Sequence, residues 1–267
     1  MSYQTLAVSH DDHGCLTVEL NRPDIRNAFN PQMIQELSDV FHKEASESQV
    51  KMVLLRGKGK VFCAGGDLNW MKKSIDYNLD QNLEDTLKLS EMFQFLNEFP
   101  KPVIGCVHGA AIGGGVGLVS VCDIVFAHEK TVFSLAEVRL GVVPACIGPF
   151  VIAKVGASHA RRLFVGAERF DAVKAKEIGL VHEVLSSETD LNEKINQLIL
   201  GLSQCGPNAV AVAKRLVLDL SWPEKRTQME DPIRYVSETL ASVRVSPEGQ
   251  EGVKAFLEKR KPSWIEN

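Results

Sequence analysis

The sequence predicts an α/β protein with a helical C-terminal layer, and two observations support this class. Up to about residue 130, short apolar runs typical of buried strands alternate with segments of helical period. This order favours a sheet covered by helices. From about residue 158 onward, strand signals thin out to one candidate at 180–184. The remaining stretches predict helices at 189–204, 207–220, 225–243 and 246–260.

The N-terminal half supplies most of the predicted strands. Residues 3–10 and 14–20 predict two strands that flank a turn at 11–14. Asn30 and Pro31 predict the start of a helix that runs to about residue 47, because asparagine caps helices and proline fits their first turn. We further expect a helix at 81–98 and strands at 53–55, 102–107 and 123–127.

The charged, amphipathic C-terminal helices allow two arrangements. Such a layer can pack on a neighbouring subunit, or it can close the core of its own chain. The hydrophobic pattern alone does not separate the two arrangements.

The composition excludes several classes of protein. The 267 residues include 30 Lys and Arg and 34 Asp and Glu, so the formal net charge is −4. This balance argues against a dedicated nucleic-acid binder, which usually presents a basic face. The first residues lack a basic segment followed by an apolar one, and no stretch approaches 18 consecutive apolar residues. We therefore expect a cytosolic protein without membrane segments.

The cysteines and histidines show no metal-binding pattern. The six cysteines include no CxxC pair, and the seven histidines form no HExxH or HxH motif. Several cysteines lie in apolar runs, as Cys106 does within residues 103–107. We expect reduced, buried thiols and no metal site.

A glycine triplet occurs within residues 111–118 (AIGGGVGL), between a predicted strand and an apolar helix. Free backbone N–H groups at such a helix start can bind an anion or an oxygen that becomes anionic during a reaction. A tight packing joint is the alternative interpretation. A dinucleotide fingerprint starting at Gly115 would need glycine where Ser120 stands, so that interpretation fails.

A second set of small residues lies within residues 62–68 (FCAGGDL), again before a predicted helix. We expect each of the two loops to follow a buried strand of one common sheet, so that two separate sources of backbone N–H groups can converge on one oxygen. Such a pair forms an oxyanion hole, in which fixed donors stabilise a negative charge that develops on a carbonyl oxygen.

Taken together, these segments and several others resemble the crotonase family, the enoyl-CoA hydratase/isomerase superfamily. The resemblance spans nearly the whole chain, with its motifs in the family's order. The matching segments are 21–23, 27–30, 62–68, 108–115, 122–123, 133–144, 172–175, 179–181 and 256–262.

The resemblance implies a fold and an assembly. Family members form a spiral of ββα units followed by a helical trimerisation region. We expect the spiral core at residues 1–200 and the oligomerisation region at 201–267. The implied assembly is a homotrimer or a dimer of trimers.

The resemblance also assigns site residues. The oxyanion donors are the amides of Gly66 and Gly114, and Glu137 is the catalytic acid–base group. The implied substrate is an acyl-CoA thioester, with coenzyme A as part of the substrate and no further cofactor. The backbone that lines the coenzyme pocket belongs to Ala28, Ala64, Gly66, Asp67 and Leu68. The candidate partners of the coenzyme phosphates are Arg26, Lys259 and Lys261. The alternative is that these three residues are ordinary surface charges.

The chemistry of a thioester explains this set of residues. Removing its α-proton, or adding a nucleophile at the β-carbon, places negative charge on the carbonyl oxygen. Each preorganised donor in a dry cleft contributes roughly 3 kcal/mol of transition-state stabilisation. A carboxylate must then move the proton or activate water.

One position departs from the family's hydratases, which commonly use two glutamates. The first is expected at position 117, where this chain has Gly117, so Glu137 stands alone. The alternative for Glu137 is a surface glutamate, paired for example with Arg139. His108 or Asn69 could replace the missing group by holding water, and Cys122 is a weaker candidate nucleophile that lacks a neighbouring base.

Three functions therefore remain open. Residues 67–71 and 113–119 resemble bacterial hydratases that are associated with methylglutaconyl-CoA-type substrates, which favours an enoyl-CoA hydratase. The lone Glu137 favours a Δ3,Δ2-enoyl-CoA isomerase, which needs one shuttle carboxylate. A relative that binds CoA or nucleic acid without catalysis is the third possibility.

Overall fold

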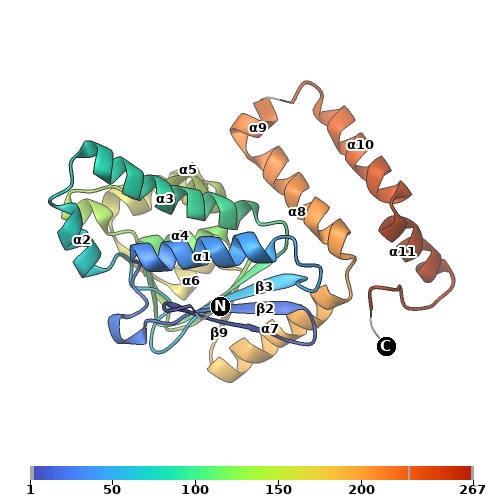
Figure 1. The fold of residues 1–267 in the computed structure, drawn as a ribbon, viewed down its shortest axis with the longest axis horizontal. Coiled ribbons are helices and arrows are strands. Elements are labelled where there is room, and N and C mark those ends of the chain that lie inside the picture. Colours follow the sequence, from blue (N-terminus) through green and yellow to red (C-terminus); the bar gives the residue numbers. More distant parts are fainter. Residues whose placement is uncertain (1–2, 228, 266–267) are drawn as a thin grey trace.

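A six-stranded sheet forms the centre of the computed structural model, which describes residues 3–227 and 229–265 (Figure 1). Its strands, in spatial order, are β1 (Leu6–His10), β2 (Cys15–Leu20), β3 (Met52–Gly57), β4 (Val103–Val107), β6 (Ile124–His128) and β9 (Glu183–Leu185). Strands β1 and β2 are antiparallel, and the other neighbouring pairs are parallel. The sheet confirms the predicted α/β class.

Alternation along the strands gives the sheet two buried faces. Met52 and Leu54 of β3 belong to one apolar cluster, whereas Val53 and Leu55 belong to another. Successive strand residues point to opposite faces, which explains the division. Figure 1 shows helices on both sides of the sheet. Helices α1 (Pro31–Glu44), α3 (Leu79–Glu98) and α4 (Gly114–Val121) cover one face, and α7 (Glu188–Ser203) covers the other.

The start of α1 agrees with its sequence signals. The Asn30 side chain accepts a hydrogen bond from the amide of Met33, and Pro31 occupies the first helical position. Helix α2 (Leu68–Ser74) begins in the same way, with Asp67 as its N-cap.

A second, three-stranded sheet was not predicted. It contains β5 (Ala110–Ile112), β7 (Val132–Ser134) and β8 (Arg169–Asp171), in that order. Each strand has three residues, which is too short for an alternating pattern to stand out in the sequence. Helices α5 (Gly148–Gly166) and α6 (Ala172–Glu177) complete this part of the chain.

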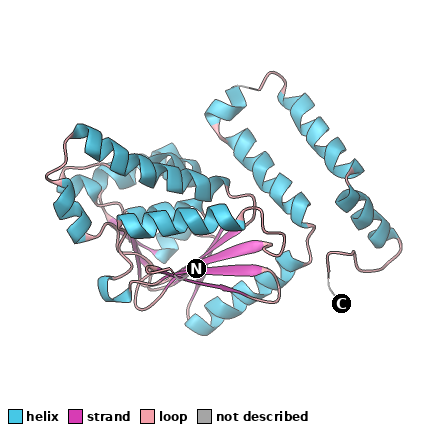
Figure 2. Ribbon diagram, viewed as in Figure 1, coloured by secondary structure: helices cyan, strands magenta, loops and turns pink. Residues whose placement is uncertain are grey.

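The predicted C-terminal helical layer is confirmed, and it extends away from the sheets (Figures 1 and 2). The Lys214 ammonium, 2.7 Å from the Asp123 carboxylate, anchors it to the core. The stretch predicted as one helix at 225–243 is divided, because Asp231 caps a new helix start. The helices are α8 (Pro207–Ser221), α9 (Pro223–Thr227), α10 (Pro232–Val245) and α11 (Pro247–Leu257). The boundary between residues 200 and 201 stays a prediction, and it falls within α7.

The cysteines agree in part with the expectation of buried thiols. All six are free, and four of them are buried. Cys146 is half-buried and Cys205 is exposed. Among the described residues, no cluster of three or more His, Cys, Asp or Glu side chains could hold a metal ion. None of the described helices combines the length and the apolar character that a bilayer crossing requires.

Asn27 joins the loop that follows β2 to the loop that follows β3. Its side chain is buried, accepts a hydrogen bond from the Arg22 amide, and donates to the carbonyls of Lys58 and Val61, each at 2.9 Å. Its φ of +54° lies in the left-handed region, which asparagine tolerates better than most residues. Asn27 thereby fixes the segments that lead to residues 62–68.

Replacing Asn27 should cost stability. We expect Asn27→Ala to lower the free energy of unfolding by about 3 kcal/mol, because buried backbone groups lose their partners. Urea denaturation measures this change. The control is Asn192→Ala on the exposed side of α7, which should stay within about 0.5 kcal/mol of the native protein. Equal stability of the two variants would contradict the role given to Asn27.

Candidate active site

Two glycine-containing loops lie side by side because their main chains pair. The first loop is residues 62–68, and the second is residues 111–118. The amide of Cys63 donates to the carbonyl of Ala110, and the amide of Ile112 donates to the carbonyl of Cys63, both at 3.0 Å. A Cβ on Gly115 would lie only 2.7 Å from the Cys63 carbonyl oxygen. A side chain at position 115 would therefore push the two loops apart.

The pairing corrects one sequence-based expectation. We expected each loop to follow a strand of one common sheet. Instead, the first loop follows β3 of the six-stranded sheet, whereas the second follows β5 of the three-stranded sheet. The bridge between Cys63 and Ala111 aligns the loops, rather than a shared sheet edge.

The amide of Gly66 points away from its own loop. The carbonyl of Gly65 accepts from the Phe29 amide, and the Asp67 amide donates to the Phe29 carbonyl, both at 2.7 Å. In an extended segment, successive residues direct their polar groups to opposite sides. Gly66 thus presents its N–H group on the side opposite Phe29, and the residue is exposed.

The amide of Gly114 is free because it starts a helix. Gly113, with a φ of +52°, donates its own N–H to the Ser134 carbonyl. Gly114 is the first residue of α4, where amides lack partners within the helix. Within residues 3–227 and 229–265, neither Gly66 nor Gly114 donates a backbone hydrogen bond. Both amides are available to an oxygen from outside the chain.

The carboxyl group of Glu137 lies beside this second loop. Its Oε1 atom is 3.0 Å from the position that a Cβ on Gly113 would occupy. Its Oε2 atom is buried and has no hydrogen-bond partner among the described residues. Burial raises the pKa of the Glu137 carboxyl above its usual range. A half-buried carboxyl of raised pKa, with one buried oxygen left without a partner, is suited to accept and donate a proton.

The surface interpretation of Glu137 does not fit the structure. Arg139 is exposed, and in the described part of the chain no ion pair joins it to Glu137, whose pKa shift has burial as its main cause. Glu137 begins the short helix η2 (Glu137–Leu140), which directs its side chain back toward Gly113.

Position 117 has no room for a second carboxylate. A Cβ on Gly117 would lie 2.3 Å from Cγ2 of Ile147 and 2.9 Å from the ring of Phe93. Both neighbours are apolar and buried. The sequence identified Gly117 as the departure from two-glutamate hydratases, but its packing partners became visible only in the fold.

The other polar candidates have structural partners or lie apart. The Nε2 atom of His108 lies 2.9 Å from the Gly59 carbonyl oxygen. Burial raises the pKa of the Cys122 thiol to about 12, so this thiol is a poor nucleophile. Asn69 is exposed on the first turn of α2.

Most of the predicted coenzyme-pocket residues lie together. Ala28, Ala64, Asp67 and Leu68 belong to the paired segments around Gly66, and the Ala64 amide donates to the Arg26 carbonyl at 3.0 Å. Arg26 is exposed beside them, with a φ of +57°.

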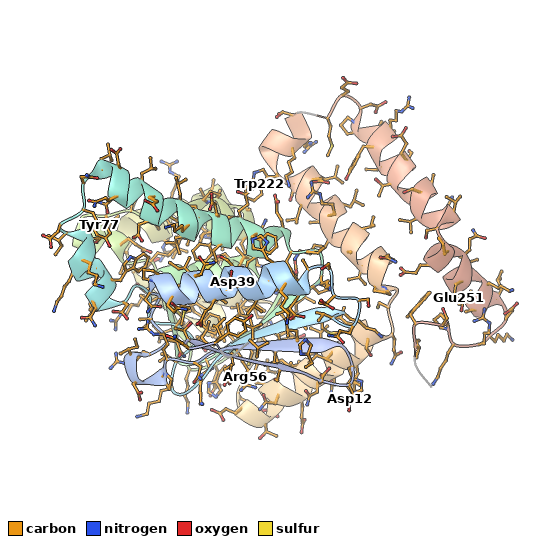
Figure 3. All side chains as sticks on the ribbon, viewed as in Figure 1. Asp12, Asp39, Arg56, Tyr77, Trp222 and Glu251 are labelled. Atoms are coloured by element: carbon orange, nitrogen blue, oxygen red, sulfur yellow. The ribbon has the colours of Figure 1, made fainter. Side chains whose placement is uncertain are left out.

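Lys259 and Lys261 do not join this group within one chain. They follow α11, next to Arg260, which is paired with Glu251. Figure 3 shows Glu251 on the opposite side of the molecule from Tyr77, which follows α2.

Two residues of the site region received no role in the sequence analysis, although the matching segments contain them. They are Asn27, described above, and Arg22, whose guanidinium lies 2.7 Å from the Asp67 carboxylate. The side chains of both residues form hydrogen bonds with backbone groups of neighbouring loops. The sequence alone does not show which backbone groups these are.

Comparison with known proteins identifies the family. The family model for enoyl-CoA hydratase/isomerase matches residues 10–267. The chain belongs to the enoyl-CoA hydratase/isomerase family. This membership confirms the resemblance to crotonases and the fold that it implies.

Some relatives of this protein are named hydratases and others are named isomerases. An enoyl-CoA hydratase structure from Shewanella pealeana ATCC 700345 is 38% identical, with a TM-score of 0.92 over 98% of this chain and 97% of that one. The 2,3-dehydroadipyl-CoA hydratase of Escherichia coli K12 is 30% identical, covering 93% of this chain and 94% of the relative. The peroxisomal Delta(3,5)-Delta(2,4)-dienoyl-CoA isomerase of Arabidopsis thaliana is also 30% identical, over 98% of both chains.

The packing at Gly117 yields a stability prediction. We expect Gly117→Ala to lower the free energy of unfolding by about 1–3 kcal/mol, because the added methyl overlaps Ile147. Adding Ile147→Ala should reverse part of the loss in a double-mutant cycle. The control is Gly201→Ala in α7, where a Cβ meets nothing within 4 Å. A native-like unfolding midpoint for Gly117→Ala would contradict the described packing.

The raised pKa of Glu137 predicts how stability depends on pH. Below the ordinary value of 4.5, the carboxyl is protonated in the folded and the unfolded chain. As pH rises through the raised pKa, the folded protein must bury a charge, and it loses stability that Glu137→Gln retains.

The variant should therefore gain free energy of unfolding relative to the native protein as pH rises. The gain should level off once the pH exceeds the raised pKa. Urea denaturation of both proteins between about pH 4 and pH 8 measures the difference. A difference that is independent of pH would show that Glu137 is solvated.

Proposed function

We propose that the protein is an enoyl-CoA hydratase that adds water across the 2,3 double bond of an acyl-CoA thioester. The observation that carries this proposal is the half-buried carboxyl of Glu137, whose buried Oε2 atom has no partner among the described residues, near two free backbone amides. Family membership supports the class of substrate.

The amides of Gly66 and Gly114 bind the thioester oxygen. Their N–H groups are held in place before the substrate arrives, so little reorganisation is required during the reaction. As charge moves onto the oxygen, these two hydrogen bonds become stronger, which lowers the barrier.

Glu137 performs both proton transfers. Its carboxylate takes a proton from water while the water oxygen forms a bond to the β-carbon. The electron pair of the double bond moves toward the thioester, and the oxygen between the two amides takes up the charge. The protonated Glu137 then returns the proton to the α-carbon. The substrate gains one water molecule, Glu137 is regenerated, and no cofactor takes part.

The hydratase is favoured by the resemblance of residues 67–71 and 113–119 to bacterial hydratases. For the same reason, we propose a branched substrate of the methylglutaconyl-CoA type. Two of the relatives described above are also named hydratases.

A Δ3,Δ2-enoyl-CoA isomerase is the second candidate, and one observation favours it. Ile147 and Phe93 occupy the place where a second carboxylate would stand. Isomerisation needs only one group, which removes a proton from one carbon of the substrate and returns it to another.

Apolar exposure on the C-terminal helices supports the proposed homotrimer or dimer of trimers. In an assembly, Lys259 and Lys261 could reach the phosphates of a coenzyme bound to a neighbouring copy. We also propose a cytosolic location, in keeping with the six free cysteines. The exposed apolar side chains of α10 and α11 are Ile233, Leu240, Val245, Val253, Phe256 and Leu257.

A substrate panel tests the function. The protein is incubated with crotonyl-CoA, 3-methylglutaconyl-CoA and a 3-enoyl-CoA, and the products are followed by mass spectrometry. Gain of one water molecule supports the hydratase. Migration of the double bond without a change in mass supports the isomerase. Binding without turnover on all three would indicate a non-catalytic relative.

Loss of the Glu137 carboxylate should abolish the reaction. We expect Glu137→Gln to lower kcat at least about 1,000-fold, because the proposed site then has no group that can carry the proton. Affinity for a saturated acyl-CoA, measured by calorimetry, should stay within about tenfold. Glu193→Gln, on the exposed side of α7, serves as the matched control with native turnover. Substantial turnover by Glu137→Gln would refute the assignment.

A further inference from the structure

A partly buried ion pair joins Arg22 to Asp67, at the end of the first glycine loop. The Nη2 atom of Arg22 is 2.7 Å from Oδ2 of Asp67, and the two side chains are 17% and 9% exposed. Such a pair is shielded from water, so its geometry is better defined than that of a surface pair. It joins two segments that are 45 positions apart in the sequence.

Each partner is also fixed to the backbone around the first loop. Arg22 donates through Nη1 to the Ala28 carbonyl, next to Phe29. Asp67 accepts the Asn69 amide at Oδ1, at 2.8 Å, and thereby caps α2. The guanidinium and the carboxylate thus connect the Phe29 segment, the first loop and the start of α2.

Gly66 lies between two anchors. On one side, the Gly65 carbonyl accepts the Phe29 amide, and on the other side Asp67 is bound to both Phe29 and Arg22. Gly65, with a φ of +92°, and Gly66 have no side chains that restrict their backbone. The direction of the Gly66 N–H group therefore depends on these anchors.

We propose that Arg22 is a positioning residue that acts through Asp67 to aim the Gly66 amide at the substrate oxygen. The inference rests on the proposed function, because it assigns the Gly66 amide to the thioester carbonyl. Arg22 itself does not touch the reacting atoms. It holds the donor whose direction determines how strongly the developing charge is stabilised.

Two conservative variants separate positioning from simple support of the fold. Arg22→Lys keeps the positive charge but loses the planar fork that reaches Ala28 and Asp67 together. Asp67→Asn keeps an oxygen that can cap α2 but loses the negative charge. Asp171→Asn is the matched control, because Asp171 caps α6, outside the loops of the active site, by accepting the Lys174 amide.

The decisive measurement is the infrared stretching frequency of a carbon-13-labelled thioester carbonyl in bound butyryl-CoA. This saturated ligand does not react, and hydrogen bonds from the two amides lower the frequency of its carbonyl. Turnover is measured on whichever enoyl-CoA substrate the native protein converts fastest, and folding is checked by circular dichroism.

We expect both variants to bind butyryl-CoA with a smaller downshift than the native protein. Their kcat should fall about 100-fold, as expected for a displacement of a catalytic group by about 1 Å, with little change in KM. Asp171→Asn should match the native protein in all three measurements. If one variant does not fold, the other decides the outcome.

A native downshift in a folded variant, or a rise in KM without a fall in kcat, would overturn the inference. Failure of the proposed function would look different. The native protein itself would then show neither a downshift with butyryl-CoA nor turnover of any substrate in the panel.

Discussion

Two short main-chain bridges determine the geometry of the candidate active site. The bridge between Cys63 and Ala111 holds the two loops together, and the bridge between Phe29 and Gly66 turns one amide outward. Because the paired groups are satisfied, the unpaired ones are left for a ligand. Gly115 allows the close approach at the first bridge, because a Cβ there would lie 2.7 Å from the Cys63 carbonyl oxygen.

The site combines a fixed electrostatic element with a single titratable group. The loops present two amides without backbone partners in the described residues, whereas Glu137, the proposed proton carrier, has a pKa that is raised by burial. The apolar contact among Gly117, Ile147 and Phe93 excludes a second carboxylate from the α4 helix. Of the two glutamate positions expected in family hydratases, the sequence and the packing at Gly117 leave only that of Glu137.

Much of the fold could be predicted from local patterns. Buried strands such as β3 and β4 and the Asn30 cap of α1 carry strong signals in a few consecutive residues. The strands of the second sheet do not, because three residues give no period and their pairing depends on residues distant in sequence. The prediction of one helix at 225–243 missed the separate helix start that Asp231 caps.

The candidate site was predictable in a different way. Gly66, Gly114 and Glu137 were named from motifs, and the structure places them around paired loops. The contact between Gly117 and Ile147 and the pair of Arg22 with Asp67 were not predictable, since each joins residues that only the tertiary fold brings together. Lys259 remains apart from the site within one chain, because α11 lies on the far side of the molecule.

A crystal structure of the protein with bound butyryl-CoA tests the central claim most directly. The account predicts the thioester oxygen at about 2.9 Å from the amide nitrogens of both Gly66 and Gly114, with the Glu137 carboxyl facing the α-carbon. A thioester bound elsewhere, or either amide hydrogen-bonded to the protein in that complex, would contradict it.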